Sequence, residues 1–339
     1  MCDLLGVRSG GEGAKPFRQG RFEDLPERPR IPHRYYDGET STVVVRSEPF
    51  GAIATHVVSY GPRDAPPLLL IHGLMTTSYS WRYMFERLGD RFRLVVPDLP
   101  GCGRSAIPAA GRRYTAAAVA TFLGELQDAL RIAGCLTVGN SLGGYLCMRA
   151  AVEDPSRFAR LATIHPPAFP EPRLVGLHVA LRVPGVAAVL ERVIRRAPRR
   201  WAHRNVHYYD ETLKSLEEVR EYGAPLASAA GARALVGYLA DALDPRALRV
   251  FARTLRRRRD RGEGFPVPLM VAYAREDPTV SPKVGRKLQP LLPGSDVHWL
   301  AHTSHFAQVD SPDRLATLLA QFLTRPEPQL TRTAAAPSR

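Results

Sequence analysis

Short apolar runs alternate with longer amphipathic segments along most of this 339-residue chain, and no other feature of the sequence restricts the fold as much. The runs predict strands at residues 41–46, 53–60, 68–71, 92–96, 135–138, 161–164, 269–273 and 297–300. Helical spacing of apolar residues predicts helices at 80–88, 115–132, 141–153 and 312–322. Strands that alternate with helices form a mostly parallel sheet with helices on both faces. We therefore expect an α/β fold whose functional loops lie at the carboxyl ends of the strands.

One long segment, residues 167–263, breaks this alternation, because it has helical patterning and no convincing strand. It leaves the expected sheet at the carboxyl end of the strand 161–164. We therefore expect a helical cap inserted between sheet strands and lying over the active face. Helices packed elsewhere on the core are the alternative. The core is then made of residues 37–166 and 264–325.

Both ends of the chain, residues 1–36 and 326–339, lack hydrophobic periodicity, which predicts disordered tails. The first residues contain no apolar signal-peptide core, and no run of about 18 apolar residues occurs anywhere. The four cysteines show neither metal-ligand spacing nor the pattern of a secreted disulfide framework. These features favour a cytoplasmic protein with reduced thiols, no bound metal and no cofactor.

The formal charge of +14 comes almost entirely from arginine, with dense clusters at residues 195–200 and 253–259. A basic patch attracts nucleic acid, anionic lipid or an acidic substrate. No zinc-finger spacing, basic-region heptad or aromatic RNA-stacking motif accompanies the clusters. We expect a solvated arginine-rich face, no nucleic-acid partner, and at most a weak contact between the basic cap and an anionic membrane.

The stretch GCLTVGNSLGGYLCMR, residues 134–149, places Ser141 in a G-x-S-x-G motif between an expected strand and an expected helix. This is the context of a nucleophile elbow, in which a serine occupies a tight, exposed turn. Gly139 and Gly143 let strand and helix approach closely, and the helix N-terminus stabilises developing negative charge. A plain glycine turn is the alternative.

A catalytic serine needs a histidine base that a carboxylate orients, and in this kind of fold the chain order is Ser, Asp or Glu, then His. Asp277 follows the strand 269–273, and His305 follows the last strand, 297–300. Both therefore lie at the same sheet edge as Ser141. This joint placement favours a catalytic triad over three unrelated surface residues.

Together these motifs resemble the α/β-hydrolase fold superfamily, in its capped branch with serine esterases, meta-cleavage C–C hydrolases, epoxide hydrolases and haloalkane dehalogenases. The resemblance implies Ser141 as nucleophile, His305 as general base and Asp277 as orienting acid. It also implies an oxyanion hole formed by the backbone N–H groups of Leu74 and Leu142. The matching pieces cover nearly all of the chain outside the tails: IHGL at 71–74, DLPGCGRS at 98–105, GNSLGG at 139–144, REDP at 275–278 and SHFAQ at 304–308.

Other residues compete for these roles. Glu276 adjoins the expected acid, but the family's spacing to the following proline selects its neighbour. Glu171 stands beyond the strand 161–164, where some relatives carry the acid. His302 departs from the family pattern and is expected to be a neighbour of the base, and a zinc site with His298 and His305 has no matching motif.

The residues Gly101-Cys-Gly103-Arg-Ser-Ala106 also fit the G-x-G-x-x-A pattern of a dinucleotide site. That fingerprint requires glycines that open a helix. Here a proline precedes them and loop residues follow, so we expect no dinucleotide.

The identity of residue 141 narrows the reaction. Haloalkane dehalogenases and epoxide hydrolases of this fold attack with an aspartate, whereas this chain has serine. We therefore expect an acyl-enzyme and hydrolysis of a carboxylic ester with a small or medium apolar acyl group. A meta-cleavage C–C bond hydrolase is one alternative, and a non-catalytic ligand-binding protein on the same fold is another. The sequence identifies neither the substrate nor the oligomeric state.

Overall fold

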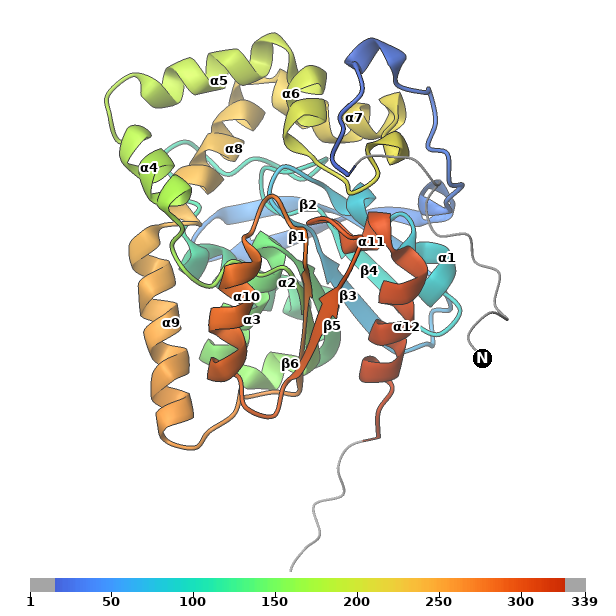
Figure 1. Cartoon of the computed structure of the whole chain (residues 1–339), viewed down its shortest axis with the longest axis vertical. Coiled ribbons are helices and arrows are strands. Elements are labelled where there is room, and N and C mark those ends of the chain that lie inside the picture. Colours follow the sequence, from blue (N-terminus) through green and yellow to red (C-terminus); the bar gives the residue numbers. More distant parts are fainter. Residues whose placement is uncertain (1–15, 327–339) are drawn as a thin grey trace, which may run out of the picture.

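The computed structural model describes residues 16–326, with an eight-stranded sheet at the centre (Figure 1). The strand order is β1-β2-β4-β3-β5-β6-β7-β8. β1, β2 and β4 pair antiparallel, and all strands from β4 to β8 run parallel. The expected mostly parallel sheet is confirmed, and β1 and β2 form an antiparallel hairpin at its edge. The strands are β1 (Glu39–Ser47), β2 (Gly51–Tyr60), β3 (Pro67–Ile71), β4 (Arg93–Pro97), β5 (Cys135–Asn140), β6 (Phe158–Ile164), β7 (Leu269–Ala274) and β8 (Asp296–Leu300).

Helices cover both faces of the sheet because its central strands are apolar on both sides. In β3, Leu69 and Ile71 belong to one buried cluster, and Leu68 and Leu70 belong to the cluster on the opposite face. The first cluster includes residues of α2 (Ala116–Leu130), α3 (Leu142–Glu153), α9 (Pro245–Asp260) and α10 (Pro282–Leu288). The second includes residues of α1 (Met84–Leu88), α11 (Ala307–Asp310) and α12 (Pro312–Leu323). No helix within residues 16–326 has the length and apolar character needed to cross a membrane.

Five helices between β6 and β7 form a layer at one end of the sheet (Figure 1). They are α4 (Pro172–Ala180), α5 (Val186–Arg196), α6 (Pro198–Asn205), α7 (Leu216–Gly223) and α8 (Ala229–Asp241). We call them the cap. Short turns of 3₁₀ helix complete this layer, namely η5 (Glu211–Leu213) and η6 (Pro225–Ala227).

The cap is shorter than the expected segment 167–263, because α9 lies beside the core (Figure 1). Leu248, Phe251 and Leu255 of α9 are buried in the same cluster as α2 and α3, and the Phe251 ring lies 5.3 Å from the Tyr145 ring of α3. Their spacing gives α9 one apolar face. An apolar face indicates that a helix packs against another surface. The spacing of its apolar residues does not tell whether that surface belongs to the cap or to the core.

The N-terminal residues 16–36 differ from the disordered tail that was expected over 1–36, while residues 1–15 lie outside the described part. The backbone carbonyls of Pro26 and Glu27 accept hydrogen bonds from the N–H groups of Leu216 and Glu217, at 2.8 and 3.0 Å. These N–H groups stand in the first turn of α7, where a helix has no internal acceptors for them. The segment is therefore held by these backbone hydrogen bonds together with side chains, among them Tyr35, which is buried in the core. Of the expected C-terminal tail 326–339, residues 327–339 also lie outside the described part.

A buried ion pair joins the cap to the core. Arg82 follows the turn η3 (Ser78–Trp81), and its Nη2 lies 2.6 Å from Oε2 of Glu218 in α7, with both side chains almost fully buried. The Tyr208 hydroxyl donates to the same carboxylate at 2.7 Å, and the Arg82 guanidinium lies over the Tyr79 ring at 4.7 Å. Burial raises the pKa of Glu218, and the nearby Arg82 opposes this effect. This contact fixes α7 above the loop that follows β3.

Candidate active site

Ser141 stands between β5 and α3 with φ 53° and ψ −120°, a backbone conformation that is rare for a residue with a side chain. Two glycines make this turn possible. A Cβ added to Gly139 would lie 2.7 Å from backbone atoms of Gly143 and Gly144, and one added to Gly143 would lie 2.4 Å from the His72 carbonyl oxygen. Contacts this short require glycine at both positions. The strand–turn–helix arrangement is therefore the strained elbow that the sequence predicts.

The loop after β3 lies against this elbow. The sheet register pairs Ile71 of β3 with Gly139 of β5, so the residues that follow the two strands are neighbours. A Cβ added to Gly73 would lie 3.1 Å from the Ser141 Cβ, and Leu74 is the next residue. Leu142 opens α3, where the first N–H groups have no acceptor within the helix.

His305 and Asp277, from the loops after β8 and β7, meet in a buried hydrogen bond. Nδ1 of His305 lies 2.8 Å from Oδ2 of Asp277, and the two side chains are 4% and 0% exposed. The other carboxylate oxygen, Oδ1, accepts hydrogen bonds from the N–H groups of Thr279 at 2.6 Å and Val280 at 2.9 Å. Both oxygens of Asp277 are therefore held, and one of them holds the imidazole ring.

Asp277 is charged despite its burial. Burial alone would raise the pKa of its carboxyl, but the charge and hydrogen bond of His305, the His165 ring and the Val280 N–H outweigh this effect and lower the pKa. An ionised carboxylate facing Nδ1 keeps the ring proton on that nitrogen. The second ring nitrogen of His305, Nε2, is then free to accept a proton.

Asn140, the last residue of β5, connects the elbow to the histidine loop. Its Nδ2 donates to the backbone carbonyl of His305 at 3.1 Å. The Ser141 N–H donates to the carbonyl of Ile164 at the end of β6, at 2.6 Å. No role for Asn140 was predicted from the sequence. Its side chain holds the backbone of His305 next to the elbow.

His165 is a buried residue of this site to which sequence analysis gave no role. It follows β6 directly, has φ 52°, and its ring centroid lies 5.4 Å from that of His305. Its Nε2 accepts a 2.6 Å hydrogen bond from the Ala274 N–H, which leaves the ring proton on Nδ1. Burial lowers the pKa of His165 to about 4, so the ring is neutral at pH 7. Its position at the carboxyl end of a predicted strand was the signal that could have identified it.

The competing carboxylate and histidine make other contacts. Glu171 accepts a hydrogen bond from the Ser281 N–H at 3.3 Å and lies 3.7 Å from Arg173. His302 pairs through Nδ1 with the Tyr209 hydroxyl at 2.8 Å. Neither contact involves His305, whose carboxylate partner is Asp277.

The glycines after β4 serve the fold. The side chain of Asp98 accepts hydrogen bonds from the N–H groups of Ser78 at 2.7 Å and Arg104 at 2.8 Å. A Cβ on Gly103 would lie 2.0 Å from an Asp98 oxygen, and no helix begins until Ala116. Gly103 therefore makes room for the Asp98 carboxylate, whereas a Cβ on Gly101 would lie 2.8 Å from the Tyr114 hydroxyl oxygen. Neither glycine opens the helix of a dinucleotide site.

Within residues 16–326, one cluster of side chains offers the ligand atoms that a metal ion needs. Among the described residues, His165, Asp277 and His305 each offer a ligand atom, and these atoms all lie within 4.8 Å of one another. A metal bound there would compete with the His305–Asp277 hydrogen bond and with the Ala274 N–H on His165. We therefore describe the three side chains by these hydrogen bonds and not as metal ligands.

The cap covers this site with apolar side chains. Leu74 and Met75, in the loop beside Ser141, pack against a cluster formed by Leu181, Ile194, Leu235 and other residues of the cap. Ser141 is only 8% exposed. Ser141 is therefore almost fully enclosed, beside a loop that packs against apolar side chains of the cap.

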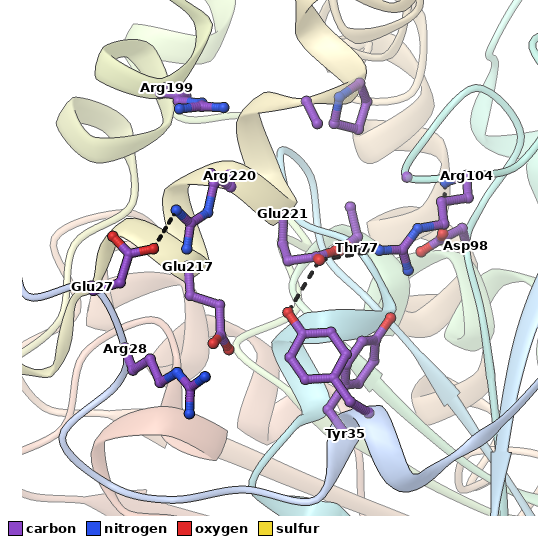
Figure 2. Close-up of a pocket in the computed structure, with 14 residues that line it drawn as sticks. Glu27, Arg28, Tyr35, Thr77, Asp98, Arg104, Arg199, Glu217, Arg220 and Glu221 are labelled. Carbon is purple, nitrogen blue, oxygen red and sulfur yellow. Dashed lines mark hydrogen bonds and ion pairs between the residues drawn. The ribbon is translucent and has the colours of Figure 1, made fainter.

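An open pocket lies elsewhere, between the N-terminal segment, α7 and the loop after β4 (Figure 2). It has a volume of about 700 Å³, and Ser141, Asp277 and His305 are not among the residues that line it. Four of its charged side chains form two ion pairs. In Figure 2, Glu27 faces Arg220 and Glu221 faces Arg104, with ion-pair distances of 2.6 and 3.1 Å. The pocket is thus separate from the candidate site.

Comparison with known proteins gives a consistent family. Residues 66–312 match the family model described as "alpha/beta hydrolase fold". The chain is 35% identical over 143 residues to the magnesium-chelatase 30 kDa subunit of Rhodobacter capsulatus. The aligned residues cover 41% of this chain and 44% of that protein. The chain is 32% identical over 143 residues to a haloalkane dehalogenase of Psychrobacter cryohalolentis, covering 42% and 45%. The match therefore spans less than half the length of these curated relatives.

A solved structure shows the same fold over a longer range. The haloalkane dehalogenase DatA from Agrobacterium tumefaciens superposes with a TM-score of 0.68 at 22% identity, covering 87% of this chain and 99% of that one. At this identity the likeness concerns the fold, and the chemistry has to be argued from the site residues.

Proposed function

The chain belongs to the α/β-hydrolase fold family, and from this premise we propose that it is a serine hydrolase with Ser141 as nucleophile, His305 as general base and Asp277 as the residue that orients the base. The buried hydrogen bond of 2.8 Å between His305 Nδ1 and Asp277 Oδ2 is the observation that carries the proposal. It occurs at the same sheet edge as a serine held on a strained elbow.

The first half of the reaction forms an acyl-enzyme. The Ser141 Oγ attacks the carbonyl carbon of the substrate while Nε2 of His305 takes the hydroxyl proton. Asp277 stabilises the resulting imidazolium through Nδ1. The backbone N–H groups of Leu74 and Leu142 donate to the oxyanion of the tetrahedral intermediate, and removing one such donor typically costs about 10²–10³ in rate.

The second half releases the acid. The tetrahedral intermediate collapses, the alcohol leaves with the proton held on His305, and the acyl group remains on Ser141. His305, neutral again, then removes a proton from water, which attacks the acyl carbon. The second tetrahedral intermediate collapses, the carboxylic acid leaves, and the proton returns to Ser141.

The apolar lining of the cap supports a carboxylic ester with a small or medium apolar acyl group as substrate. Met75 packs against the apolar cluster above the elbow loop, which includes Leu181 and Ile194. Burial of an apolar acyl chain against such a surface contributes about 25 cal/mol per Å².

A serine-directed fluorophosphonate tests the nucleophile. We expect the protein to be labelled, Ser141→Ala to abolish labelling, and Ser41→Ala, at an exposed position on β1, to label like the parent protein. Equal labelling of Ser141→Ala would refute the proposal.

A substrate panel then tests the reaction. We expect turnover of p-nitrophenyl acyl esters, with ester hydrolysis lost in Ser141→Ala, His305→Ala and Asp277→Ala. Turnover of a ring-fission dienoate in place of the esters would assign the C–C bond hydrolase reaction. Saturable binding of esters without turnover would assign a ligand-binding protein.

A further inference from the structure

The outer faces of α4 and α5 carry exposed valines. Val175 and Val179 of α4, Val183 of the connecting turn, and Val189 and Val193 of α5 are between 36% and 64% exposed. Isolated exposed apolar residues are common, but a contiguous apolar patch on a monomer marks a contact with another surface.

The exposed valines lie opposite the packed face of α4 and beside the packed face of α5. Leu177 and Leu181 from α4 and its end, and Leu190 and Ile194 from α5, face the cluster that includes Leu235 of α8. The exposed valines are spaced by four residues within each helix, so each pair lies on one face. Figure 1 shows α4 and α5 at the outer edge of the cap, with α8 on their inner side.

Arginines surround these valines, and acidic side chains are almost absent. Arg182, Arg192, Arg195 and Arg196 are exposed, and within residues 16–326 none has a carboxylate within ion-pair distance. The single acid of residues 172–197 is Glu191, which is only 20% exposed and lies 3.8 Å from Arg233. This face therefore combines exposed aliphatic groups with unpaired positive charge.

We propose that the outer face of α4 and α5, which we call the valine–arginine face, docks the protein on anionic membranes. The headgroups of such a membrane carry negative charges that attract the arginines. Directly beneath them lies an apolar layer into which the valines can insert. A second copy of the chain fits less well, because a symmetric contact would bring the two sets of arginines together. The inner face of the same helices covers the loop beside Ser141. Docking would therefore place the candidate site on the inner side of the docked helices.

Vesicle binding tests the docking without catalysis. The full chain carrying Ser141→Ala is sedimented with vesicles of phosphatidylcholine containing 50% phosphatidylglycerol, and with pure phosphatidylcholine. We expect binding to the anionic vesicles that weakens as salt rises, and much weaker binding to the neutral ones. Absence of binding to the anionic vesicles would overturn the proposal and would leave the proposed hydrolase function unaffected.

Paired variants locate the contact. We expect two double variants, Val189→Asp with Val193→Asp and Arg192→Glu with Arg196→Glu, each to weaken binding by about 20-fold or more. For the arginine pair, the reason is that one basic side chain near an anionic surface contributes roughly a factor of five. Val44→Asp on β1, at a valine that is 60% exposed, is the apolar control and should bind like the parent.

The basic control is Arg253→Glu with Arg257→Glu, in the exposed arginine cluster of α9. Equal loss of binding in this control would mean a diffuse effect of net charge, and parent-like binding by the valine pair would remove the apolar contact. Either result refutes the assignment of this face. Binding to poly-glutamate as tight as to anionic vesicles would point instead to an acidic protein, and a dimer that the valine pair dissociates would point to a second copy.

Discussion

Gly143 determines how closely α3 approaches the end of β3, and its substitution tests how finely the elbow is positioned. A Cβ at this position would lie 2.4 Å from the His72 carbonyl oxygen and 2.6 Å from that of Ile71, whereas ordinary contact begins near 3.4 Å. Both neighbours are backbone atoms and cannot rotate away. Gly143→Ala therefore requires the start of α3 to move by about 1 Å relative to β3, the difference between the two distances.

This displacement separates the two halves of the candidate site. Ser141 and Leu142 move with α3, while Gly73 and Leu74 stay with β3. A misplacement of about 1 Å can reduce a rate by about 10², which corresponds to about 2.7 kcal/mol in the activation free energy. We expect kcat/KM for a p-nitrophenyl ester, and the rate of fluorophosphonate labelling, to fall by about 100-fold.

Gly124→Ala is the matched control, because it makes the same change in the helix α2. The nearest atoms to an added Cβ there belong to the Arg157 side chain, at 3.7 Å. Alanine in a helix is more favourable than glycine by roughly 0.5–1 kcal/mol, so this variant should have wild-type activity and a slightly higher Tm. Circular dichroism establishes that both variants are folded at the assay temperature. A folded Gly143→Ala protein that keeps more than a third of the wild-type kcat/KM would refute the reasoning.

Three further substitutions are followed by urea unfolding. Arg82→Met leaves Glu218 buried without its partner and should lower the free energy of unfolding by about 3–5 kcal/mol, with part of this loss recovered when Glu218→Leu is added; no recovery would contradict the pairing. Burial raises the pKa of Asp310 to about 7, so the folded chain holds an extra proton between about pH 4 and pH 7 and its stability falls as the pH rises through that range. Asp310→Asn should reduce the stability difference between pH 5 and pH 8, and an unchanged difference would assign it to other groups. His165→Leu removes the acceptor of the Ala274 N–H and should lower the free energy of unfolding by about 1–3 kcal/mol, whereas His165→Gln, which keeps an acceptor, should lose less; equal losses would mean that packing, and not the hydrogen bond, determines the effect.

The sheet could be predicted closely because its central strands are buried on both faces. Residues 68–71 are four consecutive aliphatic side chains, which a buried parallel strand requires and a half-exposed strand does not. The strand order along the chain then placed the residues after each strand at one edge. From this order, Asp277 and His305 were expected at the same edge as Ser141, without any knowledge of side-chain contacts.

Features that depend on backbone hydrogen bonds or on a choice between two packing surfaces could not be predicted in this way. Residues 16–36 have no periodicity, yet Pro26 and Glu27 are held because the first turn of α7 needs acceptors. The apolar face of α9 gave no indication that it meets α2 and α3 and not the cap. The buried Arg82–Glu218 pair joins residues 136 positions apart, a distance at which no local pattern operates.

Residue 141 carries more information about the reaction than the rest of the scaffold. A histidine held by a buried carboxylate can activate water or a hydroxyl group, so the His305–Asp277 pair alone does not distinguish the activities found on this fold. An aspartate at the elbow is already ionised and attacks without a base, whereas a serine hydroxyl needs His305 for the first step as well as the last. The likeness to the dehalogenase structure concerns the fold. In the proposed mechanism, it is the hydroxyl oxygen of Ser141 that directs the reaction toward acyl transfer.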